Sequence, residues 1–422
     1  MSYLINLSIL RTNRNYRLLY IGQFVSFFGT MITTVALPYQ IYHITNSTLM
    51  VGLLSLFQLL PLLVTALLGG ALADRYHRRR LLLISEFLLA LGCLLLAYNS
   101  TRVIPSIPLI FVVALFMSGI SGLHRPALDS MVQQIVPKHE YPMVAALSTF
   151  MYSISMIAGP AAGGLLMAHL GIGTTFLVDF ATFFVSWIAL ILMGEIERPA
   201  RTHIESALMS IKQGFVYARS KQELLGSYTV DFVAMVFGMP MALFPAIAQQ
   251  HGGVSTLGML YSAPAVGALA IAFFGGAIEK IKRHGVGIAV SAVMWGVSII
   301  GFGLANNLTL ALFFLALAGL FDATSGMFRQ TMWNETIPND FRGRLSGIEM
   351  ISYLSGPKLG DTEAGLVAAA FGITASVVSG GVLCVASVAI CCYVFPKFWK
   401  HQSPVSSSSS ASTEDMTSSS SS

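Results

Sequence analysis

Long apolar runs dominate this sequence and constrain its fold more than any other feature. Each run has about twenty residues or more, which is the length at which an α-helix crosses the hydrocarbon core of a membrane. We predict twelve spanning helices, at about residues 18–42, 48–73, 80–99, 106–134, 141–168, 172–194, 225–249, 255–279, 286–305, 308–336, 343–371 and 373–395. The expected fold class is therefore an all-α membrane protein.

The composition agrees with this prediction. The chain has 422 residues, of which 55% are hydrophobic and 10% charged, and its mean hydropathy is +0.72. A soluble protein carries about a quarter charged residues, so charge this sparse excludes a large water-facing surface. The four cysteines lie in apolar stretches without metal-type spacing, and we expect neither disulfides nor a metal site from Cys93, Cys384, Cys391 and Cys392.

Basic residues fix the expected orientation. They gather before the first span, in every second loop and after the last span, at Arg11, Arg14, Arg17, Arg75, Arg78, Arg79, Arg80, Lys138, Arg198, Arg201, Lys212, Arg219, Lys221, Lys280, Lys282, Arg283, Arg342, Arg344, Lys397 and Lys400. The opposite loops carry only Arg102. By the positive-inside rule both termini are expected to be cytoplasmic, in a multi-pass protein of a bacterial inner membrane.

The polar segments suggest how the chain is organised. We expect a cytoplasmic N-terminus at 1–17, a six-helix bundle at 18–194, a linker at 195–224, a second six-helix bundle at 225–395 and a disordered serine-rich tail at 396–422. In the linker, Thr202 and Glu205 have capping-box spacing. An apolar stripe at helical spacing follows and predicts an amphipathic helix on the membrane face, formed by Ile204, Leu208, Ile211 and Phe215.

The two halves look like a diverged repeat. Gln133-Gln134-Ile-Val-Pro137 ends one span of the first half, and Asn334-Glu335-Thr-Ile-Pro338 ends the corresponding span of the second. At the same offset, Gly159-Pro160 aligns with Gly360-Asp361. Two pseudo-symmetric six-helix bundles are a plan used by secondary transporters.

The segment from Gly69 to Arg80 carries the most specific motif. Paired glycines allow close helix approach, and an acid followed by arginines at the membrane surface suggests a gate, formed by Gly69, Gly70, Asp74, Arg75, Arg78 and Arg79. A solvated basic loop is the simpler alternative. The pattern resembles the loop between spans 2 and 3 of the major facilitator superfamily, except that His77 replaces the usual glycine. The resemblance implies two six-helix bundles, a central cavity and alternating access.

Further segments resemble the enterobactin exporter branch of that superfamily, which includes exporters of siderophores and of drugs. They are residues 177–183, 342–344 and 356–365. The fifth span also carries Gly159, Pro160, Gly163 and Gly164. These small residues would let the helix pack against its counterpart in the other half. Similar Gly-Pro motifs mark antiporters of the superfamily, so this resemblance favours export, although plain helix packing would give the same pattern.

Ionisable residues within the spans are costly and are candidates for function. The candidates for proton coupling are Asp322, the deepest acid, together with Asp231, Asp129 and Glu86. The candidates for substrate binding or charge pairing are Arg125, Arg329, Lys358 and Asp361. Arg125 with Asp129 and Lys358 with Asp361 have the spacing of intrahelical pairs, so structural salt bridges are the alternative.

The sequence thus favours a proton-coupled exporter of a siderophore or a similar amphipathic small molecule. A multidrug antiporter and an uptake symporter of the same fold remain alternatives, since a fold does not fix direction. We expect no enzymatic activity, because the groups of a catalytic site do not cluster. We also expect no cofactor besides the proton gradient, no nucleic-acid partner, and a monomer in the lipid bilayer.

Overall fold

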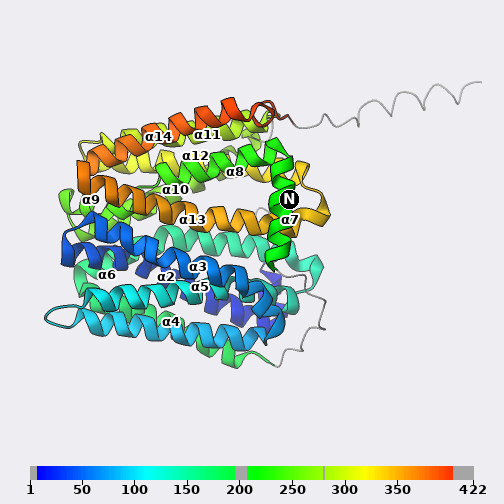
Figure 1. The fold of residues 1–422 in the computed structure, drawn as a ribbon. Coiled ribbons are helices and arrows are strands. Elements are labelled where there is room, and N and C mark those ends of the chain that lie inside the picture. The colour runs from blue at the N-terminus through cyan, green and yellow to red at the C-terminus, as the bar shows by residue number, and fades with distance from the viewer. Residues whose placement is uncertain (1–6, 195–206, 279–280, 403–422) are drawn as a thin grey trace, which may run out of the picture.

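The structure is a computed structural model that describes residues 7–194, 207–278 and 281–402 (Figure 1). Within these ranges the side chains of residues 70–75, 207–212, 272–278, 339–340, 342–344 and 346–348 are not described. The predicted capping box and the serine-rich stretch of the tail lie outside the described residues. The described chain is helical and contains no strand, which confirms the predicted fold class.

The described part of the first half, residues 7–194, contains seven helices. They are α1 (Ser8–Thr12), α2 (Arg14–Thr45), α3 (Thr48–Arg75), α4 (Arg78–Ser100), α5 (Ile107–Ile135), the 3-10 helix η1 (Lys138–Glu140) and α6 (Tyr141–Leu192). The second half follows as α7 (Ala207–Ser220), α8 (Gln222–Phe237), η2 (Met241–Leu243), α9 (Phe244–Gln250), α10 (Val254–Ile278), α11 (His284–Gly303), α12 (Leu308–Thr336), α13 (Asn339–Phe371), α14 (Ile373–Val394) and α15 (Pro396–Trp399).

These helices account for the twelve predicted spans. In the described chain, 10 stretches are long and apolar enough to cross a membrane. One of them holds two spans, because α6 turns at Gly171, whose φ of 81° interrupts the helix between the predicted fifth and sixth spans. The span at 343–371 is not among the ten, since α13 carries Lys358, Asp361 and Glu363 among its apolar residues.

The helices form two bundles that lie side by side (Figure 1). Helices α2 to α6 pack with one another in the first bundle, and α8 to α14 in the second. Two extensive contacts join the bundles, α3 with α13 and α6 with α10, and smaller ones join α3 with η2 and α2 with α9 and α10. We call the face that carries α1 and α15 the terminal side and the opposite face the loop side. Helix α7 crosses the terminal side and contacts helices of both bundles, α3, α8 and α13.

The seventh span differs from the prediction. A continuous helix was expected at 225–249, but α8 ends at Phe237 and the chain resumes as η2 and α9. Gly238 and Pro240 lie in the break, and a proline supplies no N–H for the helix that precedes it. The buried Gly238 carbonyl, which the break leaves without a helical partner, accepts a hydrogen bond from Trp295 Nε1 at 2.8 Å.

The linker contains the predicted helix, α7, but its contacts were not foreseen. Phe215, a member of the predicted apolar stripe, is exposed rather than packed on the protein. Tyr217 instead stacks on Phe341 of α13 with ring centroids 4.3 Å apart, and Ala218 is buried. The Tyr217–Phe341 stack thus fixes α7 to the second bundle through the face opposite Phe215.

Close backbone contacts hold the two bundles together toward the loop side. Thr362 Oγ1 of α13 donates to the Gly52 carbonyl of α3 at 3.1 Å, and Thr48 Oγ1 donates to the Gly365 carbonyl at 3.2 Å. At the other pair, Ser262 Oγ of α10 donates to the Ile157 carbonyl of α6 at 2.6 Å. Glycines let the backbones approach this closely.

Candidate functional site

A cavity of about 330 Å³ opens between α2, α5 and α6 in the terminal half of the first bundle. Arg125 and Asp129 of α5 line it and form the predicted pair, with 3.3 Å between Nε and Oδ2. Both side chains are more than half exposed, at 55% and 56%. The Arg125 guanidinium also lies 5.0 Å from the ring centroid of Tyr152. Further tyrosines complete the wall, Tyr16, Tyr20 and Tyr141. The cavity thus presents aromatic faces and an accessible ion pair that includes the Arg125 cation.

Glu86 is fully buried behind this cavity. Gln23, which lines the cavity, donates from Nε2 to Glu86 Oε1 at 2.7 Å. Ser26 donates to the other carboxyl oxygen at 3.3 Å, and His124 Nε2 lies 3.0 Å from Oε1. His124 of α5 thus lies against a candidate proton carrier. Glu86, His124 and Gln23 form a polar path from α4 toward the cavity.

A second cavity, of about 170 Å³, lies in the second bundle around the break in the seventh span. Asp322 of α12 lines it, and no hydrogen bond or ion pair joins Asp322 to another group of the described chain. The rest of the wall is apolar and includes one residue of the first bundle, Met156, with Met239, Met241, Phe244, Tyr261 and Trp295. Asp322 is thus an acid without a counter-charge in an apolar cavity.

Arg329 and Asp231 form an ion pair between α12 and α8. Each side chain is only 12% exposed. The sequence made Asp231 a candidate for proton coupling and Arg329 a candidate for substrate binding or charge pairing, and the structure joins the two. Glu349 of α13 is near enough to act electrostatically on Arg329. The charge on Arg329 is therefore neutralised within the protein.

Lys358 and Asp361 are neighbours on α13 but have other partners. Lys358 Nζ donates to Gln58 Oε1 of α3 at 2.6 Å. Asp361 Oδ2 accepts from Ser55 of α3 at 2.9 Å, and Oδ1 accepts from the backbone N–H of Ala242 in η2 at 2.8 Å. Among the described ion pairs none links the two, so the predicted intrahelical salt bridge is replaced by contacts across the bundles. Asp361 caps the helical turn after the break and ties it to α3.

We predict that Asp361→Ala weakens the contact between the two bundles on the loop side. The change leaves the buried Ala242 N–H without its acceptor, at a cost of roughly 1–3 kcal/mol. Spin labels at Val103 and Asn306, which are exposed on the loop side of the two bundles, should then report longer distances. The four native cysteines would first be replaced. Ser55→Ala, which removes only one of the two hydrogen bonds, is the control and should have a smaller effect. An unchanged distance in Asp361→Ala would show that Asp361 does not hold the two bundles together on the loop side.

The Gly-Pro motif of α6 packs against two helices. A Cβ added to Gly159 would meet Met31 of α2, and one added to Gly163 would meet Ile32 of the same helix. A Cβ on Gly164 would lie 2.9 Å from the Gly258 nitrogen of α10, and one on Gly258 would lie 2.6 Å from the Pro160 carbonyl oxygen. The partner in the other half is therefore α10, whereas the repeat counterpart α13 packs on α3. The repeat itself is visible, because Gly360, aligned with Gly159, meets α8 as Gly159 meets α2.

The loop motif after α3 is described only in part. The side chains of Asp74 and Arg75 and the surroundings of Gly70 are not described. Gly69 packs closely on α5, where a Cβ would lie 3.0 Å from Pro126. Arg78 donates to the Ser130 carbonyl of α5 at 2.9 Å, and Arg79 donates to the Leu190 and Ile191 carbonyls of α6 at 2.8 and 2.7 Å. Arg79 thus satisfies carbonyls in the last turn of α6, and Arg78 binds α5 more than one turn before its end, roles that the sequence did not suggest.

The structure also adds residues that sequence reasoning missed. Three of them are neutral and form hydrogen bonds with charged residues of other helices, namely Gln23, Ser55 and Gln58. The fourth, Glu349, is an acid that lies near Arg329. A glutamine within an apolar span is itself unusual, so Gln23 and Gln58 were visible as isolated polar residues. Their partners were not, because they come from other helices.

Comparison with known proteins agrees with this architecture. The chain matches the family described as transmembrane secretion effector over residues 6–417. The enterobactin exporter EntS of Shigella flexneri is 27% identical over 360 residues, which cover 85% of this chain and 86% of that protein. EntS of Citrobacter koseri is 26% identical over 360 residues with the same coverage.

Solved structures of other transporters have the same fold. A POT family transporter in complex with 5-aminolevulinic acid gives a TM-score of 0.72 at 12% identity, covering 92% of this chain and 97% of that chain. A bacterial homologue of the human lysosomal transporter Spinster, in an inward-facing and unoccupied conformation, gives 0.71 at 16% identity, covering 93% and 99%. These identities bear on the fold alone. The family match over residues 6–417 shows that the chain belongs to the transmembrane secretion effector family of the major facilitator superfamily, which is a family of membrane transporters.

Proposed function

We propose that this protein is a secondary exporter that moves a siderophore or a similar small amphipathic molecule out of the cytoplasm, driven by the proton gradient. The observation that carries this proposal is the similarity to enterobactin exporters, which extends over 85% of the chain. Cavity chemistry supports it as well. Four tyrosines and Arg125 in the first cavity suit a ligand with aromatic and anionic groups.

In this proposal the terminal side faces the cytoplasm, in a bacterial inner membrane, as the distribution of basic residues predicts. The first cavity then opens to the compartment from which the substrate comes. Contacts between α3 and α13 and between α6 and α10 keep the loop side closed in this state. Alternating access would break them, while the loop after α3, with Asp74, would act as the gate of the terminal side. The protein would work as a monomer without a cofactor.

Secretion by intact cells tests the proposal. Medium from wild-type cells and from cells lacking the gene is compared under iron limitation, together with cell extracts. We expect one iron-chelating compound to disappear from the medium and to accumulate inside the cells lacking the gene.

Complementation with the wild-type gene or with Lys138→Ala, an exposed terminal-side change outside both cavities, should restore secretion. Complementation with Tyr152→Ala should not restore it fully, since the cavity loses an aromatic wall. An identical set of secreted compounds in both strains would contradict siderophore export.

Multidrug efflux is a second candidate with an observation of its own. Three methionines, Met156, Met239 and Met241, line the second cavity. Methionine is flexible and polarizable and suits sites that accept varied ligands. This candidate predicts unchanged siderophore secretion but greater retention of amphipathic dyes in cells lacking the gene. An uptake symporter would instead leave those cells with less of its substrate inside.

A further inference from the structure

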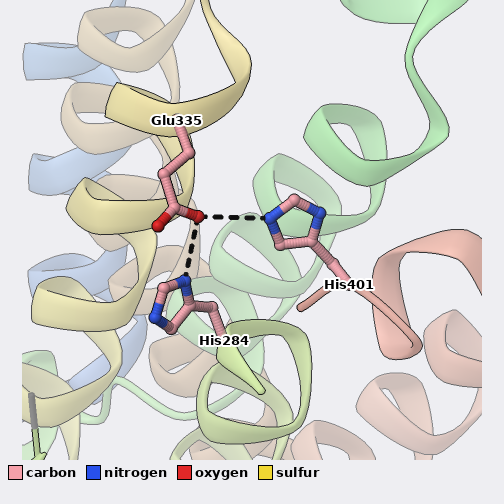
Figure 2. A group of neighbouring side chains, drawn as sticks. All are labelled: His284, Glu335 and His401. Atoms are coloured by element: carbon pink, nitrogen blue, oxygen red, sulfur yellow. Dashed lines mark hydrogen bonds and ion pairs between the residues drawn. The ribbon is translucent and has the colours of Figure 1, made fainter. Parts of the chain in front are cut away.

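Three potential metal ligands meet on the terminal side of the second bundle (Figure 2). His284 is the first residue of α11, Glu335 is near the end of α12, and His401 follows α15. His284 Nδ1 lies 3.2 Å from Glu335 Oε2, and His401 Nε2 lies 3.5 Å from the same oxygen. All three ligand atoms lie within 4.8 Å of one another. Their chain separation hides the group in the sequence, where the histidines are scattered.

The two histidines of the cluster are largely buried, and Glu335 lies at its exposed edge. The three side chains are 7%, 22% and 16% exposed, in the order His284, Glu335, His401. His401 Nε2 is buried from solvent and has no hydrogen-bond partner within the described chain. A buried nitrogen that points at a carboxylate oxygen without a hydrogen bond is costly by itself. A cation bound here would give the His401 nitrogen a partner and would share the Glu335 carboxylate with His284.

The distances fit coordination geometry. Two ligand atoms held about 2.1 Å from a tetrahedral Zn²⁺ ion are roughly 3.4 Å apart. The two distances to Glu335 Oε2 already lie on either side of this value, at 3.2 and 3.5 Å. The third edge, between the two histidine nitrogens, is within 4.8 Å and would close by a small movement of His401, which lies beyond the last helix.

The short helix before His401 is firmly placed. Phe398 of α15 is fully buried. A Cβ on Gly226 of α8 would lie 2.6 Å from the Phe398 Cβ, and a Cβ on Gly285 of α11 would collide with the Phe398 carbonyl. Two glycines thus form the seat for α15. This seat brings His401 to the α11–α12 ends independently of any ion.

We propose that His284, Glu335 and His401 form a binding site for a divalent transition-metal ion of the Zn²⁺ class, which fastens the C-terminal segment to α11 and α12. Two imidazoles and one carboxylate select such an ion over Mg²⁺ or Ca²⁺, which prefer all-oxygen sites. The fourth position is left for water. The ion bridges the end of α12, the helix that also carries Asp322 and Arg329, to the segment that leads into the serine-rich tail.

Direct binding measurements test the site. The full-length protein is purified in detergent, its affinity tag is removed and it is stripped with a chelator. Zn²⁺ is then titrated, and Co²⁺ is added separately because its visible absorption reports coordination number. We expect one Zn²⁺ per chain and an intense tetrahedral Co²⁺ spectrum. His401→Ala and Glu335→Gln should weaken binding by about 100-fold or more, since outer-shell partners alone change affinity by roughly 10–100-fold.

Two further variants separate a metal site from its alternatives. His139→Ala removes an exposed terminal-side histidine of the first bundle and should leave Zn²⁺ affinity unchanged. His401→Cys keeps a zinc ligand but not an imidazole, so it should retain Zn²⁺ binding and shift the Co²⁺ spectrum through a thiolate bond. Absence of stoichiometric Zn²⁺, or equal loss in His139→Ala and His401→Ala, would overturn the proposal. Loss of binding in His401→Cys, with the fold intact, would also contradict it.

Discussion

Arg329→Met is expected to destabilise the folded protein by about 3–5 kcal/mol, because it leaves the Asp231 carboxylate buried without a partner. The two side chains are each 12% exposed and join α12 to α8. Asp231→Asn alone should destabilise as well, by leaving the guanidinium unpaired. The double variant should recover most of the loss, since replacing both members of a buried pair removes the desolvation cost along with the attraction.

Thermal unfolding of the purified variants in detergent measures this coupling. Arg125→Met is the matched control, because Arg125 and Asp129 form the same kind of pair with more than half of each side chain exposed. An exposed pair contributes about 0–1 kcal/mol, so this change should scarcely affect unfolding. If Arg329→Met unfolds like the wild type, the pair is not structural and Arg329 becomes available again as a substrate ligand.

The pair between Arg329 and Asp231 could not be predicted from the sequence, whereas the helices that carry it could. Helix positions were predictable because apolar length and end residues fix them locally: the span expected at 308–336 is α12, Leu308–Thr336. The break in the seventh span was predictable in principle from Gly238 and Pro240. The partners of Arg329, Lys358 and Asp361 were not, because each lies on another helix. Spacing within one helix suggested Lys358 with Asp361, and packing between the bundles decided otherwise.

The partners of the four candidate acids indicate which of them is best placed to carry a proton. Of the four candidate acids, Asp129 is paired with Arg125 and Asp231 with Arg329. Glu86 is hydrogen-bonded by Gln23 and Ser26 and contacts His124. Asp322 has neither an ion pair nor a hydrogen bond to the described chain, and it lines a cavity. A carboxyl group that can change its charge without breaking a salt bridge is the best placed to bind and release protons during transport.

Asp322→Asn is therefore expected to abolish the dependence of transport on the proton gradient. Each pH unit across the membrane is worth about 1.4 kcal/mol, or roughly a tenfold concentration ratio, for every proton exchanged. Asparagine keeps the shape of the side chain but cannot carry the proton, so concentrative export should be lost. Exchange of substrate between equal pools, which needs no net proton movement, should continue.

Proteoliposomes loaded with the exported compound separate the two activities, since export under an imposed pH gradient and exchange without one are measured in the same preparation. Asp129→Asn is the control: its pair with Arg125 is exposed, and it should retain the response to the gradient. If Asp322→Asn keeps a wild-type response, proton coupling must lie elsewhere. The path formed by Glu86, His124 and Gln23 would be the next candidate, because it joins a buried acid to a cavity in the other bundle. If both export and exchange disappear in a folded protein, Asp322 binds the substrate rather than the proton.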